Sequence, residues 1–144
     1  IMDMGFSAIN TIRLFDYRKK NKVLKFFSKM YHVLFSKPYV VSYKRIMKNL
    51  VTDEEKRQHI YPTIFPNWDH TPRSGKHGLV VHRSEPEYFD RHMKEVVDTV
   101  AEKPSQHRIA FIKSWNEWAE GNYLEPDLKY GMAYLEVIKK HVCR

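Results

Sequence analysis

The sequence predicts an α/β protein whose strands run parallel in one sheet. Short apolar, β-prone runs such as 60–65 and 109–112 alternate with longer segments of helical periodicity. That alternation is typical of βα units, in which a helix returns the chain to the same edge of the sheet. The loops after these two runs, 67–73 and 115–127, are rich in aromatic, amide and carboxylate side chains. We expect both loops at the carboxyl ends of the strands, where functional groups gather in parallel folds.

The 144 residues suffice for one domain with a hydrophobic core. Two regions are expected within 1–144: a basic, largely helical segment 1–58, and the βα units with the candidate loops in 59–144. Residues 1–50 carry a net charge of +9, whereas residues 51–144 carry −1. A basic region of this kind meets nucleic acid, anionic lipid or a phosphate-bearing sugar donor, or is simply a solvated surface.

The basic half is expected to hold a short strand within 6–15 and a helix over 16–37 that Pro38 ends. The apolar residues of that helix recur at three- and four-residue spacing: Val23, Phe26, Phe27, Met30, Val33 and Leu34. Such a stripe favours packing in the core. Docking on an anionic membrane surface through residues 18–48 is the alternative. A strand or helix entry at 39–43, a helix over 43–51 and a solvated acidic turn at 53–55 follow.

The second half predicts a strand at 60–65, a short apolar piece at 79–81, a helix from 84 to about 102, a buried strand at 109–112 and a helix over 130–142. Ser84 is expected to cap the first of these helices, with Pro86 in its first turn. The inward side chains of this helix are expected to be Phe89, Met93, Val96, Val97 and Val100. Those of the last helix are expected to be Met132, Tyr134, Leu135 and Ile138.

Segment 115–127 places two carboxylates, Glu117 and Glu120, three residues apart, so that a helical turn brings them to one face. Paired carboxylates perform acid/base chemistry on glycosidic bonds, and close pairing tends to raise one pKa. The spacing permits both retaining and inverting geometries. Trp115 and Trp118 are candidates for stacking on sugar rings. The alternative is an exposed acidic loop whose tryptophans pack in the core.

Further candidates for sugar binding are Asn116 and Glu125 in the same segment and Trp68, Asp69 and Arg73 in the loop 67–73. An amide, a carboxylate or a guanidinium binds sugar hydroxyls or an anionic substituent. Core packing is an equal alternative for Trp68.

Several classes of protein are disfavoured. Cys143 is the single cysteine, no Cys/His spacing fits zinc, and no Gly-rich phosphate loop occurs, so neither a metal nor a cofactor is expected. The mixed charges around both loops and the lack of an RNA-binding aromatic signature argue against nucleic acid. No apolar run reaches the roughly 20 residues of a membrane span. The sequence leaves the oligomeric state open.

Four segments together resemble a known family: 65–73 (FPNWDHTPR), 84–89 (SEPEYF), 111–127 (FIKSWNEWAEGNYLEPD) and 130–135 (YGMAYL). They are similar to the WbsX-type glycosyltransferases of bacterial polysaccharide and O-antigen biosynthesis, relatives of the glycoside hydrolase family 99. The resemblance implies a (β/α)8 barrel of the TIM type, of which this chain is the C-terminal portion. Asn67 and His70 depart from the family, which usually has Gly and Asn there.

The same resemblance implies roles for the candidate residues. Glu117 and Glu120 match the two catalytic carboxylates of the hydrolases, the first assisting through the sugar 2-hydroxyl and the second acting as general acid/base. Trp68, Asp69 and Arg73 would line sugar subsites. The implied protein is a cytoplasmic enzyme, or a fragment of one, that acts on an oligo- or polysaccharide in cell-surface polysaccharide or lipopolysaccharide O-antigen assembly, with peripheral attachment to the inner membrane left open. The alternative is a non-catalytic carbohydrate-binding remnant, and hydrolysis and transfer both remain open.

Overall fold

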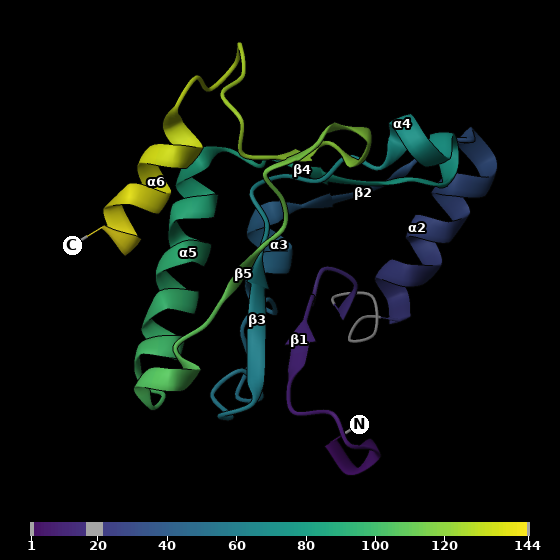
Figure 1. Cartoon of the computed structure of the whole chain (residues 1–144). Helices are drawn as coiled ribbons and strands as arrows, with labels where there is room; N and C mark the ends of the chain where they lie inside the picture. The colour runs from purple at the N-terminus through teal and green to yellow at the C-terminus, as the bar shows by residue number, and fades with distance from the viewer. Residues whose placement is uncertain (1, 17–21, 144) are drawn as a thin grey trace.

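A parallel three-stranded sheet forms the centre of the protein (Figure 1). The structure is a computed structural model that describes residues 2–16 and 22–143. The sheet contains β1 (Ile9–Thr11), β3 (Ile60–Ile64) and β5 (Phe111–Ile112) in that order. Ile9 pairs with Ile60, and Thr63 pairs with Phe111, both in parallel. The predicted parallel α/β arrangement is therefore confirmed for these strands.

The remaining elements surround this sheet. A second parallel pair joins β2 (Tyr39–Ser42) to β4 (Leu79–His82), and β6 (Asn116–Glu117) pairs antiparallel with β7 (Asn122–Tyr123). The α-helices among the described residues are α2 (Lys22–Phe35), α3 (Tyr43–Met47), α4 (Thr71–Ser74), α5 (Pro86–Ala101) and α6 (Ala133–Val142). The short 3-10 helices are Met2–Met4, Ser105–His107, Gly75–His77 and Trp118–Glu120. Helices α5 and α6 lie side by side, whereas α2 lies at the periphery next to β2 (Figure 1).

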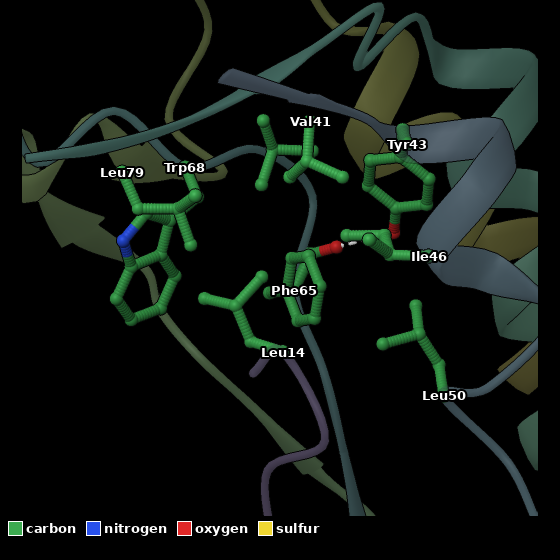
Figure 2. Close-up of a cluster of buried hydrophobic side chains, with 9 residues drawn as sticks. Leu14, Val41, Tyr43, Ile46, Leu50, Phe65, Trp68 and Leu79 are labelled. Carbon is green, nitrogen blue, oxygen red and sulfur yellow. Dashed lines mark hydrogen bonds between the residues drawn. The ribbon is translucent and has the colours of Figure 1, made fainter. Parts of the chain in front are cut away.

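Two hydrophobic clusters hold these elements together. The last residue of β3 belongs to one of them, and the residue that follows it belongs to the other. Phe65 belongs to the first, in which Leu14 lies beside it and Trp68 closes one side (Figure 2). The Tyr43 hydroxyl donates a 2.6 Å hydrogen bond to the Phe65 carbonyl, which satisfies a buried polar group. Ile64 belongs to the second cluster, together with Phe89 of α5. The strand that carries the loop 67–73 is therefore fixed on both faces.

Helix α5 confirms most of its predicted pattern. Phe89, Met93, Val96 and Val100 are buried, as their spacing predicted. The expected cap is wrong, because Glu85 holds the N-cap position without a side-chain cap bond. The Ser84 hydroxyl instead donates to the Val81 carbonyl at 3.0 Å, which ties the helix start to β4.

The strand expected at 109–112 is present as β5, but the expectation that it is buried is wrong. Ile109, Phe111 and Ile112 are all substantially exposed. The reason is topological, since β5 is an outer strand with β3 as its neighbour in the sheet. Met132, expected to face inward in the last helix, is likewise exposed because it precedes α6, whereas Tyr134 is buried.

The acidic turn at 53–55 is also more than a solvated loop. Glu55 is fully buried, and its carboxylate accepts hydrogen bonds from Thr11, Arg13 and Thr52. Arg13 also pairs with Asp16 and Glu54. This cluster fastens the chain that follows β1 to the segment that precedes β3.

The expectation that the apolar stripe of the first long helix packs in the core is wrong. Val23, Phe26, Phe27, Met30, Val33 and Leu34 are all exposed on α2. Residues 17–21, in the first part of the expected helix, lie outside the described residues. Within the described part of the chain, no helix has the length and apolar character needed to cross a membrane.

Candidate active site

The two loops singled out in the sequence lie against each other at the carboxyl ends of β3 and β5. The Asp69 amide donates to the Glu120 carbonyl at 2.8 Å, and the Tyr123 amide donates to Asn67 Oδ1 at 2.9 Å. The buried Asn122 side chain donates to the Asn67 carbonyl at 2.5 Å. These bonds, between residues more than fifty positions apart, make the two loops one surface.

Gly121 permits this close approach. Its φ of +48° lies in the left-handed region that glycine adopts without steric cost. A Cβ built there would come within 2.7 Å of the Asp69 Cβ and 2.9 Å of the Asp69 amide nitrogen. The glycine therefore both turns the chain after Glu120 and lets the second loop touch the first.

The two glutamates meet on one guanidinium. Arg73 Nη1 lies 2.8 Å from Glu120 Oε1, and Arg73 Nη2 lies 3.2 Å from Glu117 Oε1. The one-turn 3-10 helix Trp118–Glu120 brings the carboxylates to the same side, as their spacing predicted. Arg73 was expected to bind substrate, but in this structure it binds the two candidate catalytic groups.

Glu120 makes more contacts with positively charged groups than Glu117 does. Lys113 Nζ lies 3.1 Å from its Oε2, and His70 Nε2 lies 3.5 Å from its Oε1. Burial raises the pKa of Glu120, but the hydrogen bond and charge of Lys113, with the charges of Arg73 and His70, outweigh burial and lower the pKa overall. The expectation that pairing raises the pKa of one of the two carboxyls is therefore wrong for Glu120.

The three tryptophans occupy different environments. Trp68 is 8% exposed in the core, and the Lys113 ammonium lies 5.0 Å from the centre of its ring. Trp118 is about half exposed and stacks on Tyr123, with ring centres 3.7 Å apart and planes inclined by 18°. Its indole nitrogen donates to Glu125 Oε2 at 2.6 Å. Trp115 is exposed, so the core alternative holds for Trp68 alone.

The remaining predicted residues divide between the surface and the loop framework. Asn116 is exposed beside Glu117 in β6. Asp69 Oδ1 accepts from the amide of Thr71 at 2.9 Å and from its hydroxyl at 2.6 Å, which begins α4. One carboxylate oxygen of Asp69 therefore holds the loop in shape rather than facing a substrate.

A cavity of about 430 Å³ opens next to the junction of the loops. Trp68, Asp69 and Trp118 line it, together with Tyr123 and Lys129. Arg73, Glu117 and Glu120 do not line it. The structure thus gathers the predicted residues into a carboxylate cluster and an adjoining aromatic cavity.

Sequence reasoning missed Lys113 and Tyr123. Lys113 directly follows β5, and the rule that functional groups sit at the carboxyl ends of parallel strands could have singled it out. Tyr123 has no such signal, because its role depends on stacking with Trp118 across the β6–β7 turn. Burial and a 3.0 Å hydrogen bond to Asp127 raise the pKa of Tyr123 to about 12, so its hydroxyl stays protonated. Among the described residues, no group of three His, Cys, Asp or Glu side chains could hold a metal ion.

Comparison with known proteins identifies the family. The family model described as Glycosyltransferase WbsX matches residues 3–138. The chain belongs to the WbsX glycosyltransferase family. The match covers both candidate loops of this WbsX-family chain and also its basic N-terminal region.

Two curated relatives of the WbsX-family chain come from two strains of Xanthomonas campestris pv. campestris. Each is named Uncharacterized protein WxcX and is 40% identical over 102 residues, which is 67% of this chain. The matched part is 15% of the length of each relative, so the chain spans a small part of the proteins it resembles. No solved structure matches the chain significantly.

Proposed function

We propose that this WbsX-family chain is part of a carbohydrate-active enzyme that assembles bacterial cell-surface polysaccharide, including the O-antigen of lipopolysaccharide. The observation that carries the proposal is the convergence of Glu117 and Glu120 on Arg73, at the carboxyl ends of parallel strands. Exposed aromatic rings lie beside this pair, as glycan recognition requires. The substrate is an oligo- or polysaccharide, and the proposed location is cytoplasmic.

In this proposal Glu117 and Glu120 are the catalytic carboxylates, with chemistry like that of glycoside hydrolase family 99. Glu117 assists through the sugar 2-hydroxyl, and Glu120 acts as general acid/base. Without substrate, Arg73 and Lys113 hold Glu120 ionised, in the form of a base. Because the Arg73 side chain is half exposed, a glycan can displace it, which removes one of the charges that lower the pKa of Glu120.

The aromatic and polar residues supply the sugar subsites. The stacked Trp118 and Tyr123 offer a rigid apolar platform that Glu125 orients through the indole nitrogen. Trp115 and Asn116 are exposed next to Glu117, where a ring face and an amide can contact a neighbouring sugar. Trp68 and Asp69 line the adjoining cavity, which fits a second sugar unit.

We further propose that the fold is the C-terminal portion of a (β/α)8 barrel. The strand order β1–β3–β5 follows the chain order, so each crossover steps to the next strand in the same direction. Barrels have this succession, whereas doubly wound sheets reverse it. The exposed β5 supports the same proposal, because barrel closure would give that strand a second neighbour.

The test is glycan turnover, measured as release or transfer of labelled oligosaccharide from bacterial surface glycans. Glu117→Gln and Glu120→Gln should each abolish turnover, because an amide neither donates a proton nor acts as a base. Glu102→Gln, on the exposed end of α5, is the control and should retain full activity. Activity that survives both substitutions at 117 and 120 rules out the assignment.

A second candidate is a non-catalytic carbohydrate-binding module. It is favoured by the ion pairs that neutralise both carboxylates and by the Trp118 ring, which is about half exposed and stacks on Tyr123. Calorimetric titration with surface glycans distinguishes the two functions. A module binds glycan without turnover, loses affinity in Trp118→Ala and keeps it in Glu120→Gln.

A further inference from the structure

We infer that the outward face of α2 is a docking surface for an anionic lipid bilayer. The α2 stripe consists of Val23, Phe27, Met30 and Leu34, whose spacing of three and four residues places them on one face. Figure 1 shows α2 at the periphery of the molecule, away from α5 and α6. The inference is independent of the chemistry at Glu117 and Glu120.

Helix α2 is attached to the protein by its polar side. Ser28 and His32, one turn apart, are its least exposed described side chains. The His32 ring stacks on Tyr39 of β2 at 4.4 Å, and its Nδ1 lies 2.8 Å from the Lys37 carbonyl. Surface helices of globular proteins normally do the opposite, burying the apolar stripe and exposing the polar face.

The α2 stripe is therefore open. Its four side chains are between 41% and 67% exposed. Further large apolar side chains flank it and are also exposed: Phe26, Tyr31, Val33 and Phe35. A contiguous apolar surface of this kind marks a binding surface rather than ordinary surface composition.

Charge selects the occupant of this surface. Residues 18–48 carry ten Lys and Arg and no Asp or Glu. Exposed Lys29 lies on α2 itself. A second copy of this chain would bring two such positive segments together, whereas a layer of anionic head groups neutralises them. A basic helix with Phe and Leu on its apolar face lies in the plane of a bilayer interface.

The test is flotation of the 144-residue chain with lipid vesicles at physiological salt. The chain should float with vesicles of phosphatidylglycerol and phosphatidylethanolamine and stay behind with vesicles of phosphatidylcholine. The double variant Phe27→Asp/Leu34→Asp should partition at least about tenfold more weakly, because two apolar side chains no longer insert. The matched control is Leu128→Asp, a fully exposed leucine outside the stripe, which should float like the parent chain.

Thermal unfolding and sedimentation complete the test. The double variant should keep the melting temperature of the parent, because the stripe makes no internal core; a clear drop shows that these side chains are packed and overturns the inference. Equal flotation of parent and double variant, or no flotation with anionic vesicles, overturns it as well. A dimer that the double variant dissociates, in a chain that does not float, makes a second copy the occupant instead. Glu117→Gln should still float even if it abolishes glycan turnover.

Discussion

Lys113 sets the ionisation of the central carboxylate. Its ammonium lies 3.1 Å from Glu120 Oε2 and contributes to the lowered pKa of that group. Lys113→Met keeps an apolar stem over Trp68 but removes the charge, so the pKa of Glu120 should rise. The measurement is a pH titration of the Glu120 carboxyl carbon by NMR.

The control for this titration is Lys129→Met, which removes a cation that lies over the Tyr130 ring instead. It should leave the pKa of Glu120 where it is. An unchanged Glu120 pKa in Lys113→Met would mean that Arg73 and His70 fix its ionisation without Lys113.

Glu55 makes the stability of the protein sensitive to acid. Burial raises its pKa, but hydrogen bonds from Thr52, Arg13 and Thr11 lower it below the ordinary value of 4.5. A carboxyl whose folded pKa is depressed stabilises the fold above its unfolded pKa, and this stabilisation is lost as pH falls through the folded pKa. The unfolding free energy should therefore decline as the pH falls below about 4.5.

Glu55→Gln tests this linkage. At pH 7 it should lower the unfolding free energy by about 2 kcal/mol, because Arg13 and Thr52 lose charge-assisted bonds. The difference from the parent should narrow below pH 4.5, as the parent loses its ionised carboxylate. Urea unfolding at a series of pH values measures both effects. The control is Asp53→Asn, at an exposed carboxylate nearby, which should leave the pH dependence of the unfolding free energy nearly unchanged. If the free-energy difference between the parent and Glu55→Gln is the same at every pH, the linkage is contradicted.

At this scale the sequence predicts contacts within one segment better than contacts between segments. The shared face of Glu117 and Glu120 follows from helical spacing and is confirmed. The burial of Glu55 could not be predicted, because its partner Arg13 lies 42 residues away. Arg73, which also lowers the pKa of Glu120, contacts it from 47 positions earlier in the chain and could not be predicted for the same reason.

Helix α5 is the element whose packing contributes most to the second core cluster. Phe89 is fully buried and meets Tyr134 of α6 edge to face, with ring centres 5.5 Å apart. Phe89→Ala should lower the unfolding free energy by about 3–5 kcal/mol, since it removes the ring and leaves a cavity. Phe111→Ala is the matched control on β5, where the ring is about half exposed, and should cost about 1 kcal/mol or less. Denaturant unfolding of both variants is the measurement, and equal losses would contradict the difference in burial.

A comparison of α5 with segment 109–112 shows why periodicity predicted helices better than strands. The stripe of α5, from Phe89 to Val100, repeats over about three turns, so the sequence shows which side of the helix is buried. Segment 109–112 is short and uniformly apolar, a pattern that leaves open which side is covered. The prediction for α2 failed for a different reason. Its apolar stripe is clear in the sequence, but the stripe does not show whether the surface that covers it belongs to the same chain.

At the scale of the whole molecule, the sheet ends in two outer strands. Among the residues that the structure describes, β3 has β1 and β5 as neighbours, whereas β1 and β5 each pair with β3 alone in this sheet. The parallel class was predictable from the alternation of elements. Closure into a barrel is not visible in this chain and stays a prediction.

Barrel closure predicts how the free edge of β5 behaves in longer family members. In a closed barrel the strand that matches β5 gains a second neighbour, so its outward amides are hydrogen-bonded and exchange slowly. Hydrogen exchange of peptides covering 109–113 should therefore be about a hundredfold faster in this chain than in the matching peptides of a longer WbsX-family protein. The peptide covering Val96 serves as the reference, because this residue is buried in α5 without help from a closed barrel. Equal exchange at 109–113 in both proteins would mean that the sheet stays open at β5 and that the family builds its site on an open sheet.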